Sequence, residues 1–201
     1  FSESRMRQSN VHPFLQTHRG CPFTCAFCHT ADSYYSRMLF LSPEIFRQDM
    51  RYLGRRFAGR HDVILHLANT NMGFFEEDFA IARIIRQTQE EYGWPRFLDV
   101  NSGKDPKKLI EMLSVIKFRP GIALQTLTPN VLENIKRKNL PFKDYISFQH
   151  DVLKKTGEIS VTELILCLPG ETKETFLETL KAVLNSGVQD IVIYTLMNLK
   201  G

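Results

Sequence analysis

Short β-rich runs alternate with longer segments of helical periodicity along the chain of 201 residues. This alternation is typical of repeated βα units, whose strands pair side by side in a parallel sheet. We therefore predict the α/β class, and within it a partial TIM-like (β/α)6 barrel with parallel strands. Sites of such folds lie at the C-terminal ends of the strands. The six predicted strands cover residues 11–17, 62–68, 96–101, 122–127, 159–168 and 191–199.

Start and stop signals mark several of the predicted helices. A cap residue followed by proline is typical of a helix start, and glycine of a helix end. Apolar side chains at helical spacing indicate the faces that pack on the core. The start signals are Ser42–Pro43, Asp105–Pro106 and Thr128–Pro129, the end signal is Gly157, and the apolar faces are Phe75, Phe79, Ala82 and Ile85, then Phe176, Leu180, Val183 and Leu184.

The composition is that of an ordinary globular protein, with 43% hydrophobic and 24% charged residues. No apolar run approaches the about 20 residues of a membrane span, and the first residues lack both a signal peptide's apolar stretch and an initiator Met. We expect one domain over residues 1–201, a soluble piece of a longer protein with no membrane partner. The net charge of +4 is spread along the chain, so it neither demands nor excludes nucleic acid.

Three of the four cysteines, Cys21, Cys25 and Cys28, form a CxxxCxxC loop directly after the first predicted strand. This crowding does not fit a disulfide scaffold, and it favours a reducing compartment such as the cytoplasm. Soft thiolates that lie close together favour iron–sulfur clusters, zinc or copper. We interpret the loop as the ligand set of a four-iron cluster with one iron left open.

The cysteine loop has two other interpretations. One is a structural zinc site completed by His29 or another histidine, although zinc motifs usually contain a second CxxC pair. The other is three reduced thiols without a metal. The fourth cysteine, Cys167, stands in the apolar run ELILCLP, and we predict that it packs in the core as a small buried side chain.

At RGCPFTCAFC the sequence resembles the radical S-adenosylmethionine (SAM) superfamily, and the likeness runs over nearly the whole chain. The resemblance implies that Cys21, Cys25 and Cys28 bind a [4Fe-4S] cluster whose open iron is chelated by the amino and carboxylate groups of SAM. It also implies reductive cleavage of SAM to methionine and a 5′-deoxyadenosyl radical that abstracts hydrogen from substrate. An electron donor such as flavodoxin or ferredoxin would supply the electron.

The resemblance also points to residues that contact SAM. Phe27 matches an aromatic position at the adenine, and it is equally suited to packing. The run NTNM follows the second strand, where other members carry GGE against the amino group, and asparagines there also form turns. Arg137 matches a basic position that pairs with the SAM carboxylate in some members, while a solvated helix face is the other interpretation. The predicted SAM contacts are Phe27, Asn69, Asn71, Ser102, Gln125 and Arg137.

Two further segments, LQTLTPNVLENIKRKN and LPGETKETF, look most like cobalamin-dependent, methylthiotransferase-like or Elongator-like members of the superfamily. In the second segment, Glu171 is expected to begin a helix, where its charge suits the helix dipole. We predict a radical SAM enzyme acting on an unidentified substrate, by cobalamin-assisted methyl transfer if a cobalamin-binding domain accompanies this one in the full protein. The alternatives are a tRNA-modifying radical SAM enzyme (methylthiolation or a related reaction) and a non-enzymatic, zinc-stabilised βα module that binds a partner.

Overall fold

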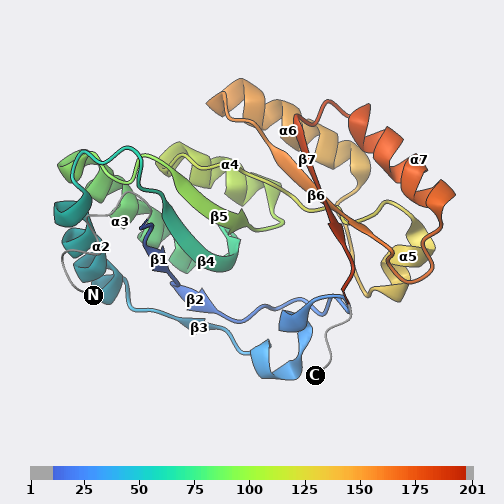
Figure 1. Ribbon diagram of the computed structural model, residues 1–201, viewed down its shortest axis with the longest axis horizontal. Helices are drawn as coiled ribbons and strands as arrows, with labels where there is room; N and C mark the ends of the chain where they lie inside the picture. Colours follow the sequence, from blue (N-terminus) through green and yellow to red (C-terminus); the bar gives the residue numbers. More distant parts are fainter. Residues whose placement is uncertain (1–10, 198–201) are drawn as a thin grey trace. The chain divides into compact units, whose positions relative to one another are not determined.

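The computed structural model describes residues 11–197, which form two compact units (Figure 1). The first unit contains residues up to 19 and residues 39–119. The second contains residues 20–38 and those from 120 onward. Among the described residues, no helix combines the length and the apolar character needed to cross a membrane.

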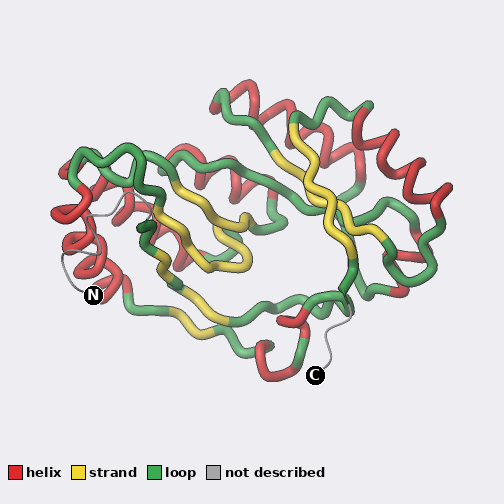
Figure 2. Tube along the Cα trace, in the orientation of Figure 1, coloured by secondary structure: helices red, strands yellow, loops and turns green. Residues whose placement is uncertain are grey.

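The first unit is built on a parallel sheet in the order β1–β4–β5. These strands span Phe14–Leu15, Leu65–Met72 and Leu98–Ser102, and Figure 2 shows them in yellow. The antiparallel pair β2 (His18–Arg19) and β3 (Leu39–Phe40) extends the first strand. Helices α2 (Pro43–Phe57) and α3 (Glu76–Tyr92) pack against each other, and α4 (Pro106–Val115) follows β5.

The second unit begins with the cysteine loop (residues 20–28) and two short 3-10 helices, η1 (His29–Ala31) and η2 (Ser33–Tyr35). After residue 120 come α5 (Pro129–Asn134), α6 (Phe142–Thr156), β6 (Val161–Leu166), α7 (Lys173–Leu184) and β7 (Asp190–Thr195). The strands β6 and β7 pair in parallel from Val161↔Asp190 to Leu166↔Thr195. A core of Val131, Ile135, Ile165 and Leu168 joins α5 to the end of β6.

The parallel strand pairing confirms the predicted α/β class, but the fourth predicted strand is not a continuous strand. The segment meets β6 only through the parallel bridges Gly121↔Val161 and Gln125↔Leu164. Gln125 has a φ of 65°, so the backbone leaves the extended conformation there. The last strand ends at Thr195, before the predicted boundary, and residues 198–199 of that prediction lie outside the described residues.

The predicted helix signals are largely confirmed. Ser42 accepts a hydrogen bond from Glu44 N, Asp105 accepts from Lys107 N and Lys108 N, and Gly157 ends α6 with a left-handed φ of 70°. Thr128 precedes α5, but its hydroxyl donates to Glu171 instead of capping the helix.

Three predictions about single residues were wrong. Leu184 is 59% exposed, because it is the last residue of α7. Glu171 does not begin a helix, since Thr172 caps α7 and Glu171 lies before it. Cys167 is exposed rather than buried, because the chain turns at this residue with a φ of 65° and carries its side chain out of the apolar strand.

Candidate cluster and cofactor site

The cysteine loop is held by backbone hydrogen bonds within the second unit. Cys21 N donates to Tyr35 O at 2.9 Å, and Cys28 N donates to Cys25 O at 2.9 Å. Ala26 N donates to Ile135 O at 2.9 Å, which fastens the loop to the end of α5. Three separate bonds therefore fix the path of the chain between the cysteines.

The thiols of the loop fit an iron–sulfur cluster in their chemistry. None of the three forms a disulfide; Cys25 is buried, Cys21 is half-buried and Cys28 is exposed. Among the described residues, no three His, Cys, Asp or Glu side chains converge as they would around one metal ion. A cubane cluster takes one thiolate at each ligated iron, so its ligands surround a body larger than a single ion. The three cysteines stay the predicted ligands.

Arg137 lies beside the buried thiol and is itself only 8% exposed. Its Nη1 is 3.7 Å from Cys25 Sγ, its Nη2 donates to Ala123 O, and its Nε donates to Asn139 Oδ1 at 2.9 Å. Burial lowers the pKa of the guanidinium, and the nearby Cys25 and Glu163 oppose that shift. A solvated helix face, one interpretation of this basic residue, is thereby excluded.

Gln125 places a buried amide two residues after Ala123, whose carbonyl accepts from Arg137. Its side chain is 6% exposed, and Nε2 lies 3.5 Å from Glu163 Oε2. Its Oε1 has no hydrogen-bond partner among the described residues. Buried polar atoms are normally paired, so this oxygen is suited to receive a donor from a ligand.

Glu163 and Tyr194 were missed by the sequence reasoning. Glu163 stands within β6, and its negative charge, followed by burial, raises the pKa of Tyr194 on the neighbouring strand β7. An acidic residue in the middle of the apolar run VTELIL was the available signal, because a charge is rare within such a strand unless it has a partner.

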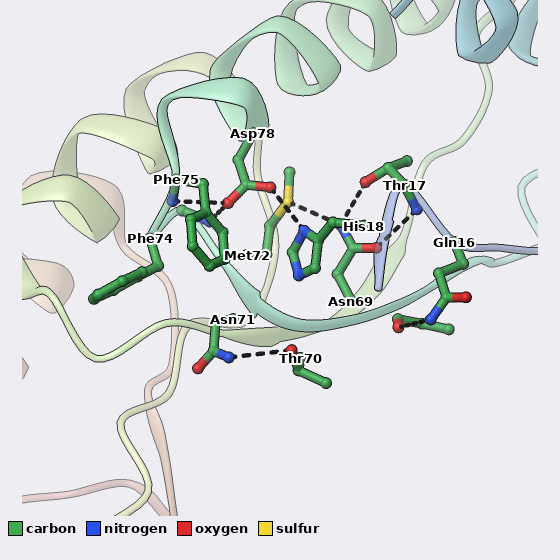
Figure 3. Close-up of polar contacts among 12 residues, drawn as sticks. Gln16, Thr17, His18, Asn69, Thr70, Asn71, Met72, Phe74, Phe75 and Asp78 are labelled. Carbon is green, nitrogen blue, oxygen red and sulfur yellow. Dashed lines mark hydrogen bonds and ion pairs between the residues drawn. The ribbon is translucent and has the colours of Figure 1, made fainter. Parts of the chain in front are cut away.

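The predicted contacts Asn69 and Asn71 lie in the first unit, at the end of β4 (Figure 3). Asn69 is 1% exposed and uses both ends of its amide on Thr17: Oδ1 accepts from Thr17 N at 3.0 Å, and Nδ2 donates to Thr17 Oγ1 at 2.6 Å. Asn71 Nδ2 donates to Thr70 Oγ1 at 3.1 Å. Asn69 thus joins β4 to the chain just after β1.

A buried contact between His18 and Asp78 was also missed. His18 Nδ1 lies 3.2 Å from Asp78 Oδ1, and both side chains are 1% exposed. Asp78 Oδ2 accepts from Gly73 N at 2.9 Å and from Phe75 N at 3.2 Å. Figure 3 shows Asp78 between His18 and Phe75. The pair therefore holds the turn between β4 and α3. Its sequence signal is Asp78, three residues after Phe75, because an acidic side chain in that position can bond back to the residue that precedes the helix.

The remaining predicted contacts are divided between the units. Phe27 packs against the core of Val131, Ile135, Ile165 and Leu168, as its packing interpretation required. Ser102 ends β5 in register with Met72 at the end of β4. In the second unit the structure brings Arg137 to Cys25, and Gln125 to Glu163. It collects Asn69, Asn71 and Ser102 at neighbouring strand ends in the first.

Comparison with known proteins identifies the family. The sequence family described as the Radical SAM superfamily matches residues 15–183. The chain belongs to this superfamily and is a radical SAM enzyme domain. Members use SAM and a [4Fe-4S] cluster.

Individual relatives are similar over nearly the whole chain. They include 2-(S-pantetheinyl)-carbapenam-3-carboxylate methyltransferase of Streptantibioticus cattleyicolor (27% identity over 94% of this chain) and the cobalamin-dependent radical SAM methyltransferase TokK of Streptomyces tokunonensis (28% over 96%). A tRNA-2-methylthio-N(6)-dimethylallyladenosine synthase of Endomicrobium trichonymphae is 24% identical over 88% of the chain and 42% of its own length. The chain spans 28% of the length of each of the two methyltransferases.

A solved structure confirms the fold. The radical SAM methyltransferase TsrM of Kitasatospora setae, with cobalamin and a [4Fe-4S] cluster bound, has a TM-score of 0.74 and 16% identity. The match covers 92% of this chain and 34% of TsrM. At 16% identity the similarity supports a conclusion about the fold alone. That fold agrees with the predicted partial barrel of the radical SAM type.

Proposed function

We propose that this chain is the radical SAM core of a cobalamin-dependent methyltransferase, with Cys21, Cys25 and Cys28 as the ligands of its cluster. The observation that supports this most is the loop of three cysteines outside any disulfide. Backbone hydrogen bonds hold this loop, and the buried guanidinium of Arg137 contacts it at Cys25. The similarity to TokK supports cobalamin as the further cofactor. Residues 1–201 form the core domain, and cobalamin is bound by another part of the full protein.

When bound, the cluster and SAM supply the one-electron chemistry that activates an unreactive carbon. The residues of the chain bind and orient these groups. Gln125 of the second unit offers SAM an amide oxygen that has no hydrogen-bond partner among the described residues. Asn71 and Ser102 offer polar groups at strand ends of the first unit. Phe27 packs beside the loop and keeps water from its buried side.

Methyl transfer is favoured over tRNA methylthiolation because two methyltransferases match at higher identity and over more of the chain than the methylthiolation enzyme does. We further propose a flavodoxin or ferredoxin as the electron donor, and the cytoplasm as the compartment. Support comes from the three loop cysteines, none of which is in a disulfide, as a reducing environment favours.

The test is metal loading of single-cysteine variants. Purified without oxygen, the wild type is expected to be brown, to hold about four irons and four sulfides, and to cleave SAM when reduced. Cys21→Ala, Cys25→Ala and Cys28→Ala are each expected to lose most of the iron and all of the SAM cleavage. Cys167→Ala is the matched control and keeps both, since its thiol is exposed at a turn outside the loop.

The same measurement separates the alternatives. A colourless wild type with one tightly bound zinc would support the zinc-stabilised module and contradict the proposal. Full iron loading and SAM cleavage in any one of the three loop variants would remove that cysteine from the ligand set.

A further inference from the structure

Arg137 differs from the basic residues around it. Lys136 and Lys138 are exposed, whereas the Arg137 side chain turns inward and is 8% exposed. A buried charge is retained only where hydrogen bonds and opposite charge offset the loss of water. The inward position of the Arg137 side chain therefore calls for partners that stabilise its charge.

Each edge of the guanidinium has an acceptor. Nη1 donates to Cys25 Sγ over 3.7 Å, a hydrogen-bond distance for sulfur, while Nη2 donates to Ala123 O and Nε donates to Asn139 Oδ1 at 2.9 Å. Because the guanidinium is planar, three acceptors around it fix both its position and its orientation.

Asn139 holds the Arg137 guanidinium in place through its own hydrogen bonds. While its Oδ1 accepts from Arg137, its Nδ2 donates to Leu124 O at 2.8 Å and to Thr126 O at 2.9 Å. The Arg137–Asn139 pair thus connects residues 123–126 to the cysteine loop, next to the backbone bond from Ala26 N to Ile135 O.

The local charges are complementary. The guanidinium is a cationic donor, and its Nη1 is 3.7 Å from Cys25 Sγ. A thiolate at Cys25 would accept a stronger, charge-assisted hydrogen bond than a thiol. Because a cysteine binds metal as its thiolate, this geometry suits a cluster-ligating sulfur at Cys25.

We propose that Arg137 is a positioning residue for Cys25: it donates a hydrogen bond to the cluster-ligating sulfur and stabilises the negative charge that the cluster gains on one-electron reduction. This role rests on the proposed function, in which Cys25 is a cluster ligand. It differs from the pairing with the SAM carboxylate that the family resemblance implies, because it operates before SAM binds.

The test is the midpoint potential of the SAM-free cluster in the full chain, reconstituted without oxygen. The titrant is dithionite with redox mediators, which supplies the electron, and the reduced cluster is followed by electron paramagnetic resonance. The variants are Arg137→Met, which removes charge and donors, and Arg137→Lys, which keeps the charge without the planar donor set. The control is Lys138→Met, which removes a charge from an exposed neighbour.

Arg137→Met is expected to make cluster reduction about tenfold less favourable, a shift of about 59 mV to lower potential for a one-electron couple. Arg137→Lys is expected to shift in the same direction by less, and Lys138→Met to match the wild type. Iron content per chain is measured on the same samples. Loss of iron from folded Arg137→Met also supports the role, because a misplaced sulfur binds iron poorly.

Each contrary outcome leads to a different conclusion about Arg137 or about the proposed function. If Arg137→Met keeps its iron and its SAM-free potential and only binds SAM more weakly, the residue acts on the SAM carboxylate and the inference is overturned. If circular dichroism shows that Arg137→Met does not fold, the potential of Asn139→Leu is measured in its place. A smaller shift in the same direction is expected, and an unchanged potential would overturn the inference. A wild type without a cluster would remove the proposed function and this inference together, whereas a loaded wild type with an unaffected Arg137→Met removes the inference alone.

Discussion

Tyr145 shows how strongly the interior of the second unit constrains a single side chain. It lies in α6, is fully buried, and stacks on Phe142 with the ring centroids 5.9 Å apart. Burial raises the pKa of its phenol to about 12, because an ionised oxygen would lose its hydration. The unfolded chain has the ordinary value of about 10.

This shift predicts a loss of stability at high pH. Between about pH 10 and pH 12 the unfolded chain releases the Tyr145 proton and the folded chain keeps it. The free energy of unfolding therefore falls as the pH rises, by up to about 1.4 kcal/mol per pH unit from this group. Urea unfolding of wild type and Tyr145→Phe at pH 8, 10 and 11 measures it. The variant is expected to lack this part of the decline, and identical slopes would contradict the assignment.

At the scale of elements, the turn into the cysteine loop depends on a glycine. Gly20 has a φ of 108°, and a Cβ added there would lie 2.6 Å from Arg37 O and 2.8 Å from Tyr35 O. Both carbonyls belong to the segment that accepts the Cys21 N–H, so neither can move without disturbing the loop. Gly157, at the end of α6, also has a left-handed φ, but no atom lies within 4 Å of its added Cβ.

The two glycines give a matched pair of substitutions. Gly157→Ala is expected to cost about 1 kcal/mol, the backbone penalty alone. Gly20→Ala adds a clash with two carbonyls and is expected to cost about 3 kcal/mol and to lower iron loading. Urea unfolding and iron analysis of both variants check this. Equal costs with equal iron content would show that the close approach at Gly20 does not matter.

For the whole molecule, the division into two units places all three predicted ligands in the second. A group that binds only the folded state stabilises it, by about 2.7 kcal/mol when its concentration is 100 times its dissociation constant. Hydrogen exchange shows which segments gain stability, because different segments of a folded chain open with different free energies.

Cluster loading is therefore expected to slow amide exchange most in residues 20–38 and 120–139, which surround the ligands. Helix α3 of the first unit is expected to change less. Hydrogen exchange of wild-type chain with and without the cluster, read by mass spectrometry, measures the difference. Cys28→Ala treated in the same way is the control and should gain no protection. An equal gain over α3 would contradict this expectation.

Local sequence patterns predicted the α/β class, the caps at Ser42 and Asp105, the end of α6 at Gly157 and the CxxxCxxC motif. These features depend on residues close together in the chain, so spacing and conformational preference suffice to identify them. The prediction that Cys167 is buried was wrong, because an apolar run does not reveal a left-handed turn within it.

Only the tertiary structure decided what the polar side chains do. Asn69 is bound to a residue 52 positions earlier, and Arg137 meets a sulfur 112 positions earlier. Desolvation of a charge and pairing of a buried amide depend on which distant segments the fold brings into contact. That information is absent from any local pattern, so the sequence alone revealed the cysteine motif and only the tertiary structure revealed the contacts around it.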